Sequence, residues 1–326
     1  MTRAPAQTTD FSRLLVQIQR RTEPLLRRAL TRSRREAKPL GPEVTDLVDA
    51  VQSLSLRGGK RLRPALLWVG AHAAPGPVRG PARSTARSRN TAHREGAPTE
   101  NSLLQFGVAL ELMQAYFLIH DDWMDGDEER RGGPTAHVAL TRALGSPFLG
   151  ERSAILAGDL ALALAQRQVA ELDVPCDRLV TSLRDFAEMQ TAAVYGQQLD
   201  IVGRTEDPEL TYALKTASYT VLGPLRVGAS LAGAPAATRA ALTRFSAPAG
   251  IAFQLRDDLI GVFGDPEKTG KPRGGDLRAG KRTWMLVQAQ REATPAQRRL
   301  LTRVLGRRDA PTADLEAALG VLERTR

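Results

Sequence analysis

Cysteine, aromatic residues and long apolar runs are all scarce in this chain of 326 residues. The single cysteine, Cys176, excludes an intramolecular disulfide and any metal site built from several cysteines; we expect it to be a small apolar filler. No stretch approaches about 20 uninterrupted apolar residues, so we expect no transmembrane helix. The start of the chain lacks the apolar run of a secretory signal. These absences together predict a cytoplasmic protein.

Alternation of apolar and polar residues with a period of two is absent as well, which argues against half-buried strands. Apolar residues recur at helical spacing instead, and the abundant Leu, Ala, Arg, Gln and Glu favour helix. The sequence therefore predicts an all-α protein without a substantial sheet. The expected helices span residues 10–37, 42–56, 65–73, 102–125, 135–144, 153–172, 177–198, 208–232, 238–263, 284–292, 295–306 and 312–323.

Basic charge is the main excess, with a formal net charge of +10. Such a balance suits nucleic acid, an anionic membrane surface or phosphorylated substrates. The arginines between residues 20 and 35 are expected to form a solvated helix face. Residues 74–101, dominated by Pro, Gly, Ser, Thr and Arg, are predicted to be a disordered basic loop within a single domain of residues 1–326. We expect no nucleic-acid partner and no stable membrane insertion.

An acidic cluster closes the helix that is expected to end near residue 125. Asp121 and Asp125 are four residues apart, so they share one helix face. Such a pair can bind a hard divalent cation, and Mg²⁺ prefers one or two carboxylates together with substrate phosphate. Arg130 and Arg131 follow, and guanidinium groups match phosphate geometry. The pattern suggests a metal–diphosphate site; the alternative is a solvated helix end.

A second acidic helix end, at Asp257 and Asp258, repeats this arrangement. A glycine-rich loop follows it and carries Lys271 and Lys281. Two such ends could oppose each other across a helical cavity and hold Mg²⁺ between them, with cations on both sides for diphosphate.

Two further segments carry polar groups that suit an anion. In residues 58–64, a glycine pair allows close backbone approach before Lys60 and Arg63 lead into a helix N-terminus. Lys215 and Thr216 lie inside an expected helix, where a plain core would not hold them. We interpret this pair as phosphate-binding.

These segments occur together in one known family. The chain resembles the trans-isoprenyl diphosphate synthases, or polyprenyl synthetases, over most of residues 40–290. The resemblance implies the isoprenoid synthase fold, with helices bundled around a deep central cavity, usually as a homodimer. The matching segments, in the family's order, are GGKRLRP at 58–64, DDWMDGDEERRGGPT at 121–135, GQQLD at 196–200, KT at 215–216, FQLRDD at 253–258 and GKRT at 280–283.

The resemblance also implies an activity. It is that of a Mg²⁺-dependent prenyltransferase, which condenses isopentenyl diphosphate head-to-tail with dimethylallyl, geranyl or farnesyl diphosphate. The products would be a short-chain all-trans prenyl diphosphate and diphosphate. By analogy, three Mg²⁺ ions bind to Asp121, Asp125 and Asp257, with Asp122 in support. Arg130, Lys215, Lys271 and Lys281 would hold the allylic diphosphate, Lys60, Arg63 and Arg131 would hold isopentenyl diphosphate, and Gln254 and Thr216 would line the site between them.

Two positions depart from the family pattern. Gly261 stands where many members have a third aspartate in the second acidic motif, although Asp265, one turn further on, could help. Gln114 stands where many members have a histidine that contacts isopentenyl diphosphate, and a glutamine side chain can still donate a hydrogen bond.

Product length is expected to depend on the residues just before the first acidic motif. Tyr116 and Phe117 lie five and four residues before Asp121, about one helical turn below the metal site. Two adjacent aromatic rings there should stop a growing prenyl chain early, so we predict a C15 product, with C20 next. The alternative is that one ring turns into the helix packing, which would lengthen the product.

Other functions remain open from the sequence. A class I terpene cyclase also uses an acidic helix end, but it needs no second diphosphate site, and its second metal triplet is not found. A non-catalytic partner subunit would be marked by lost aspartates, and these are intact. A nucleic-acid or membrane binder would rest on net charge alone.

Overall fold

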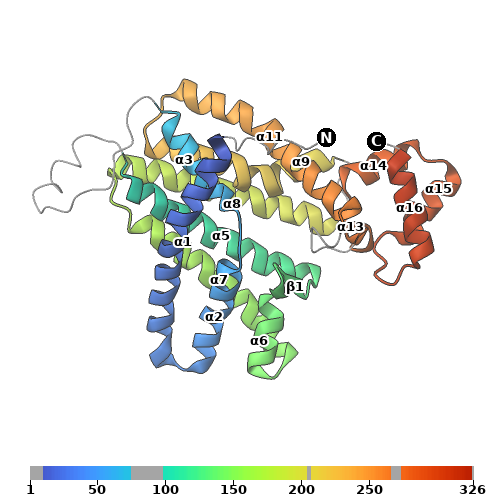
Figure 1. Cartoon of the computed structure of the whole chain (residues 1–326), viewed down its shortest axis with the longest axis horizontal. Helices are drawn as coiled ribbons and strands as arrows, with labels where there is room; N and C mark the ends of the chain where they lie inside the picture. The colour runs from blue at the N-terminus through green and yellow to red at the C-terminus, as the bar shows by residue number, and fades with distance from the viewer. Residues whose placement is uncertain (1–9, 75–97, 204–206, 266–272, 325–326) are drawn as a thin grey trace, which may run out of the picture. The chain divides into compact units, whose positions relative to one another are not determined.

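The computed structural model describes residues 10–74, 98–203, 207–265 and 273–324, which are almost entirely helical (Figure 1). Within these ranges the only strands are β1 (Glu129–Arg130) and β2 (Gly133–Pro134), which pair antiparallel. The prediction of an all-α protein without a substantial sheet is therefore confirmed. The predicted basic loop falls mainly on residues 75–97, which lie outside the described residues.

The chain divides into two compact units: Met1–Asp185 with Pro224–Ala240, and Phe186–Gly223 with Ala241–Arg326. The expected single domain stays a prediction. Unit 1 contains α1 (Asp10–Ala37), η1 (Lys38–Leu40), α2 (Pro42–Leu56), α3 (Leu62–His72), α5 (Glu100–Asp125), β1, β2, α6 (Ala136–Leu144), α7 (Pro147–Ala170), the start of α8 (Cys176–Val202) and most of α10 (Gly223–Leu231). Unit 2 contains the rest of α8, α9 (Pro208–Tyr212), η2 (Ala213–Leu222), most of α11 (Ala236–Phe263), α13 (Gly275–Arg278), α14 (Trp284–Glu292), α15 (Pro295–Val304) and α16 (Thr312–Arg324).

Helix α5 is the central helix of unit 1. It begins where the Thr99 side chain accepts a hydrogen bond from the Ser102 amide at 3.1 Å, and it packs chiefly against α7, with α3 and α1 also in contact. By length and composition α5 could cross a membrane, but 72% of its apolar window is buried inside the protein. Its apolar surface is therefore used in the core, where Phe106, Leu110 and Met113 are fully buried.

Two helices differ from their predicted form. Helix α7 begins at Pro147, six residues earlier than expected, because the Ser146 side chain accepts from the Leu149 amide and proline suits the first helical position. The helix expected over 208–232 is divided into α9, the π-helical segment η2 and α10. Sequence periodicity does not distinguish a π-helix from an α-helix, so this division was missed.

Unit 2 brings its helices unusually close to η2. A β-carbon on Gly196 of α8 would overlap the backbone of Lys215, and one on Gly250 of α11 would overlap Ala217. Glycine at both positions allows this approach. Further along, α13 to α16 bury a separate apolar cluster that includes Leu286, Leu301 and Leu319.

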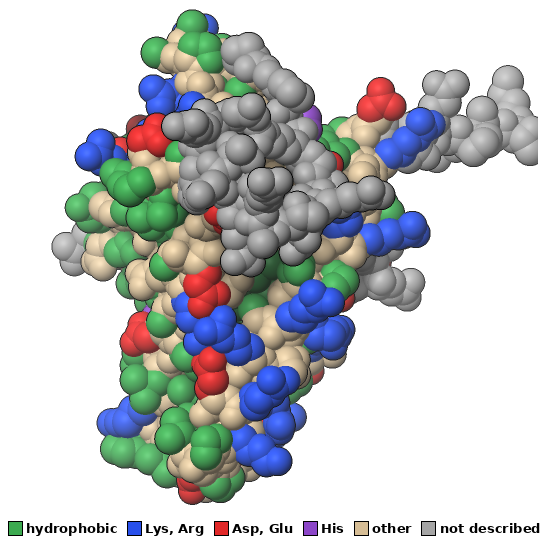
Figure 2. Space-filling model, turned by 90° about the vertical axis from the view of Figure 1, so that its left-hand side faces the viewer, with side chains coloured by type: hydrophobic (Ala, Val, Ile, Leu, Met, Phe, Trp, Pro, Cys, Tyr) green, Lys and Arg blue, Asp and Glu red, His purple; other side chains and the backbone are tan. Residues whose placement is uncertain are grey.

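The arginines of α1 fall into two sets. Arg32 donates to Glu171 at 2.9 Å and Arg34 to Asp49 at 2.7 Å, which fastens α1 to its neighbours. Arg20, Arg27, Arg28 and Arg35 are also exposed, as expected of a solvated face. Figure 2 shows Lys and Arg side chains gathered in a column on one face of the molecule. The cysteine prediction is wrong, because Cys176 is exposed at the first residue of α8 rather than packed as filler.

A buried ion pair joins three helices of unit 1. Arg61, left-handed at φ 51°, donates to Glu111 on α5 at 2.6 Å and to the carbonyl of Ser55 on α2 at 2.9 Å. The side chains of Arg61 and Glu111 are 1% and 3% exposed. One of the cations in the basic turn is therefore structural. A buried pair of this kind adds modest net stability when intact, but removing one partner is costly.

We expect Glu111→Gln to lower the free energy of unfolding by about 3–5 kcal/mol, because it leaves the Arg61 charge buried without a carboxylate. Glu100→Gln is a matched control on the same helix, since Glu100 pairs with Arg21 at 2.5 Å but both side chains are about a quarter exposed. The control should cost about 0–1 kcal/mol. Urea denaturation that gives equal losses for the two variants would contradict this prediction.

Candidate active site

The acidic end of α5 is shaped by a left-handed glycine. Asp121 and Asp125 are partly buried on successive turns, and the helix ends at Gly126, where φ is 65°. The Asp127 amide then donates back to the Asp122 carbonyl at 2.8 Å. The two carboxylates thus lie at the C-terminal end of the helix, whose dipole also favours cations.

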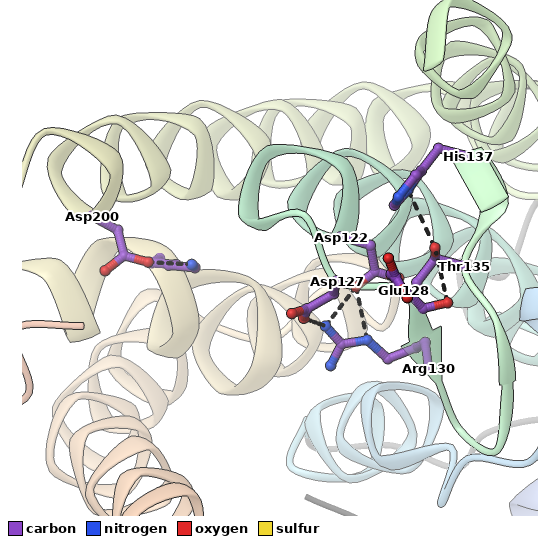
Figure 3. A network of polar contacts seen from close by, with 8 residues as sticks. Asp122, Asp127, Glu128, Arg130, Thr135, His137 and Asp200 are labelled. Atoms are coloured by element: carbon purple, nitrogen blue, oxygen red, sulfur yellow. Dashed lines mark hydrogen bonds and ion pairs between the residues drawn. The ribbon is translucent and has the colours of Figure 1, made fainter. Parts of the chain in front are cut away.

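Asp122 is fully buried and binds an arginine. Arg130 on β1 donates to its carboxylate through Nε at 2.8 Å and Nη2 at 2.5 Å, and to Asp127 at 3.0 Å (Figure 3). Burial raises the pKa of Asp122 to about 6, and the Arg130 charge opposes this shift. Arg130, predicted to hold the allylic diphosphate, is therefore already paired with two carboxylates.

The turn between β1 and β2 presents the next arginine. Arg131 and Gly132 have φ values of 54° and 69°, the pattern of a type I′ hairpin turn. Lys60 follows Gly58 and Gly59, which also have positive φ. These two turns line an open cavity of about 780 Å³. Of the residues predicted for isopentenyl diphosphate, Lys60 and Arg131 line this cavity, whereas Arg63 is buried in the first turn of α3.

Sequence reasoning missed the role of Arg57. Its guanidinium donates to the carbonyl of Arg130 at 3.2 Å and to that of Pro134 at 2.6 Å, so it holds both strands of the hairpin. A β-carbon on Gly133 would overlap this guanidinium. Gly133 was the available signal in the sequence, because a glycine in a strand often marks the close approach of another group.

Unit 2 gathers residues from four separate sequence motifs around one small cavity of about 70 Å³. Lys271 lies outside the described residues, so its predicted role is not tested. The five predicted residues that line the cavity are Lys215, Thr216, Gln254, Asp257 and Lys281, together with Asp200, Thr211, Tyr212, Asp258, Asp276, Arg282 and Thr283.

A hydrogen-bond network in this cavity centres on Tyr212, which the sequence did not single out. The Tyr212 hydroxyl donates to the Asp258 carboxylate and accepts from the Trp284 amide at 2.7 Å. Gln254 donates to Asp258 at 2.7 Å and accepts from Thr216 at 2.5 Å. Burial raises the pKa of Asp258 to about 6, and the two hydrogen bonds oppose this shift. Tyr212 therefore links α9, α11 and the start of α14.

Lys215 is held by a carboxylate in the absence of phosphate. Its ammonium group lies 2.5 Å from Asp200, which comes from the GQQLD segment of α8 and is labelled in Figure 3. A phosphate that binds Lys215 would take the place of this carboxylate. The pairing gives a physical reason for a partly buried carboxylate near the end of α8.

The structure explains the glycine that departs from the family pattern. A β-carbon on Gly261 would overlap the carboxylate of Asp276, which lines the same cavity as Asp257. An aspartate at 261 would therefore meet a carboxylate that is already in place. Asp265, considered as a substitute, is exposed and does not line this cavity.

The carboxylates fit Mg²⁺ by their chemistry. Asp121 and Asp125 supply oxygen ligands from one helix face, and Mg²⁺ commonly takes one or two carboxylates while substrate phosphates and water complete its shell. Among the described residues, no group of three or more His, Cys, Asp or Glu side chains forms a metal cluster. The roles of Asp121, Asp125 and Asp257 as ligands stay predictions.

The predicted floor residues lie together on α5. The rings of Tyr116 and Phe117 are tilted, with centroids 4.8 Å apart, and both side chains are partly buried. Gln114 is also partly buried, half a turn earlier. The rings of Tyr116 and Phe117 therefore contact each other on α5.

The helical fold of this chain is the isoprenoid synthase fold, as its likeness to solved prenyl synthases shows. The chain belongs to the polyprenyl synthetase family, whose family model matches residues 44–322. The resemblance drawn from the sequence motifs is thereby confirmed.

Three known proteins show the similarity. A (2E,6E)-farnesyl diphosphate synthase of Mycobacterium tuberculosis is 33% identical over 81% of this chain and 66% of its own length, just under two thirds. A geranylfarnesyl diphosphate synthase of Aeropyrum pernix is 33% identical over 81% of this chain and 76% of its own. The solved geranylgeranyl pyrophosphate synthase from Corynebacterium glutamicum, complexed with isoprenyl diphosphate and magnesium, aligns with a TM-score of 0.83 and 33% identity, covering 97% of this chain and 87% of that one.

The Asp258 network predicts a pH window for stability. Burial raises the Asp258 pKa from 3.8 to about 6, so stability should fall as pH rises from about 4 to 6 and then level off. Tyr212→Phe removes a donor to the carboxylate, so the pKa should rise further and the fall should continue above pH 6. Urea denaturation between pH 4 and 8 checks this, with Tyr195→Phe, an exposed tyrosine on α8, as control. If the stability of Tyr212→Phe also stops falling near pH 6, the assignment of this pH dependence to Asp258 is refuted.

A second prediction concerns Gly261. Gly261→Asp should lower the free energy of unfolding by about 1–3 kcal/mol through overpacking against Asp276, with like-charge repulsion in addition. Asp276→Gly in the same chain should recover most of the loss. Gly320→Asp is the control, because a β-carbon there meets only the end of Arg324 at 3.6 Å. The contact is not the cause if the double variant is no more stable than Gly261→Asp.

Proposed function

We propose that this chain is a Mg²⁺-dependent trans-prenyltransferase, which condenses isopentenyl diphosphate head-to-tail with an allylic diphosphate. The observation that carries the proposal is the convergence in unit 2 of Lys215, Thr216, Gln254, Asp257 and Lys281 on one cavity. These residues come from two helical segments, η2 and α11, and one loop, and an acid, an amide and two lysines suit a metal-bound diphosphate. Membership of the polyprenyl synthetase family supports the same reaction.

The allylic diphosphate is assigned to the cations of this cavity. Lys215 exchanges Asp200 for phosphate, Lys281 adds a second positive charge, and Thr216 and Gln254 offer polar contacts beside them. Lys271 is assigned to the same substrate by the family pattern. Arg130 is also assigned to it, and Asp122 sets the position of its guanidinium.

Asp121, Asp125 and Asp257 are assigned as ligands for three Mg²⁺ ions. When bound, Mg²⁺ neutralises the negative charge that develops on the departing diphosphate. Asp121 and Asp125 lie on the last two turns of α5, so one helix presents both carboxylates.

Isopentenyl diphosphate is assigned to the cavity of unit 1. Lys60 and Arg131 line it, and Arg63 and Gln114 belong to the same substrate by the family pattern. The left-handed backbone at Arg131 supports this assignment, because strained non-glycine residues cluster at ligand sites. A class I terpene cyclase would leave this cationic cavity without a substrate.

The reaction follows from these assignments. The allylic C–O bond breaks and leaves diphosphate, and the double bond of isopentenyl diphosphate then attacks the allylic cation to form the new C–C bond. Loss of a proton to the departed diphosphate completes the turnover. A site that excludes water protects the cation.

Product length is assigned to Tyr116 and Phe117. The relatives named above make products of different length at the same identity, so similarity does not decide between them. The contact between the two rings supports an early stop to the growing chain. We assign C15 as the main product and C20 as the next.

A homodimer is part of the proposal, as is a cytoplasmic location. Exposed apolar side chains support the dimer, since solvent-exposed patches of this kind commonly mark association. They follow one stripe on α7, at Phe148, Leu149, Ile155 and Leu156, and another on α8, at Val194, Tyr195, Ile201 and Val202.

The test is turnover by the purified full chain with Mg²⁺, labelled isopentenyl diphosphate and C5, C10 or C15 allylic primers. We expect prenyl diphosphates of C15 and C20, identified by chromatography after dephosphorylation. Asp121→Ala should reduce turnover by at least about 100-fold, because the charge on the leaving group is then poorly neutralised. Glu128→Gln, a nearby exposed carboxylate without an assigned role, should retain activity.

Four results would contradict parts of the proposal. No turnover with any primer would favour a non-catalytic subunit, and cyclic hydrocarbons would favour a cyclase. Normal turnover by Asp121→Ala would refute its metal role. Light scattering on the same preparation tests the dimer, which a monomer mass would contradict.

A further inference from the structure

We propose that His120 is a positioning residue for product length, which fixes the ring of Tyr116 and is itself seated against Gly158. The inference deepens the proposed function and rests on it. Sequence reasoning gave His120 no role, because a histidine before two aspartates carries no signal about its neighbours on another helix.

His120 follows Tyr116 by one turn of α5, and side chains at this spacing lie over each other. The imidazole meets the Tyr116 ring edge-on, with centroids 4.8 Å apart and an interplanar angle of 72°. The Tyr116 ring also meets the ring of Phe117, with centroids 4.8 Å apart. The tyrosine ring therefore has two aromatic neighbours, one of which is His120.

Helix α7 fixes the imidazole in turn. Nε2 of His120 donates to the carbonyl of Ile155 at 3.0 Å, and the carboxylate of Asp159 lies 4.0 Å away. Both contacts come from the same stretch of α7. The orientation of the imidazole is thus set by a second helix rather than by α5 alone.

Gly158 makes the room for this arrangement. A β-carbon at this position would overlap the imidazole, with Nε2 as its nearest atom. Glycine inside a helix costs about 1 kcal/mol relative to alanine, so a mid-helix glycine calls for a packing reason. Here the reason is the histidine ring that lies against the α7 backbone.

The consequence concerns the path of the prenyl chain. If the imidazole is removed or displaced, Tyr116 loses one of its two ring neighbours and gains freedom to rotate. The floor that Tyr116 forms with Phe117 then no longer blocks the product, and the prenyl chain grows further before release. His120 and Gly158 act on product length only through Tyr116, since neither is assigned to contact substrate.

The experiment compares product lengths made by His120→Ala and Gly158→Ala, each alone and combined with Tyr116→Ala. Each single variant should raise the ratio of the next-longer product to the main product by about 2- to 10-fold, the range expected from one edge-to-face aromatic contact. Added to Tyr116→Ala, neither should change the ratio further. Gly150→Ala is the matched control, because a β-carbon there overlaps Thr141 on α6 and is remote from Tyr116 in sequence.

Failure of the positioning role can be distinguished from failure of the proposed function. Variants that lose stability or turnover but keep the parental product ratio would overturn the positioning role. An equal shift in the Tyr116→Ala background would show that the effect does not pass through Tyr116, and would also overturn it. A shift in Gly150→Ala as large as that in Gly158→Ala would have the same meaning. If the unmodified chain shows no turnover, it is the proposed function that is contradicted, not the positioning role. If His120→Ala does not fold, Gly158→Ala still decides the matter alone.

Discussion

The ion pair between Arg130 and Asp122 is the constraint on which the first acidic motif depends. It ties the hairpin to the last turn of α5, and Arg57 fastens the same hairpin through the carbonyls of both strands. Asp122 is fully buried, so its carboxylate requires a partner, and Arg130 supplies it. Asp122 therefore has a structural role in this acidic run, whereas Asp121 and Asp125 are the carboxylates proposed to bind metal.

Unit 2 uses the same principle with a different outcome. Lys215 is paired with Asp200, but both side chains are partly exposed, at 23% and 28%. A partly exposed pair is weakly bound compared with a buried one, so the phosphate that we propose for Lys215 would replace the carboxylate at modest cost. The Arg61–Glu111 pair, at 1% and 3% exposure, is closed to exchange. Burial therefore distinguishes Arg61, which holds the fold, from Lys215, which we propose binds a substrate.

The sequence predicted those features that depend on local pattern. Asp257, Gln254, Lys215, Thr216 and Lys281 were found because residue type and spacing carry their chemistry, and the helices because their apolar period is clear. The contacts of Tyr212, Arg57 and Asp276 were missed, since each depends on a partner 15 to 77 positions away that no local pattern specifies. The π-helical form of η2 was missed for a related reason. It accompanies the close approach of Gly196 and Gly250, which is a tertiary event.

Two arginines adopt a left-handed backbone conformation that residues other than glycine rarely adopt. Arg61 and Arg131 are the only non-glycine residues with positive φ in the described part of the chain, and each lies in a glycine-containing basic turn. Glycine would adopt this backbone without strain, yet it could supply neither the buried pair to Glu111 nor a cation at the hairpin turn. The strain is tolerated at Arg61 because the ion pair compensates within the fold. At Arg131 the guanidinium donates instead to the carbonyl of Gly58 at 3.4 Å, which joins the hairpin turn to the other glycine-containing basic turn.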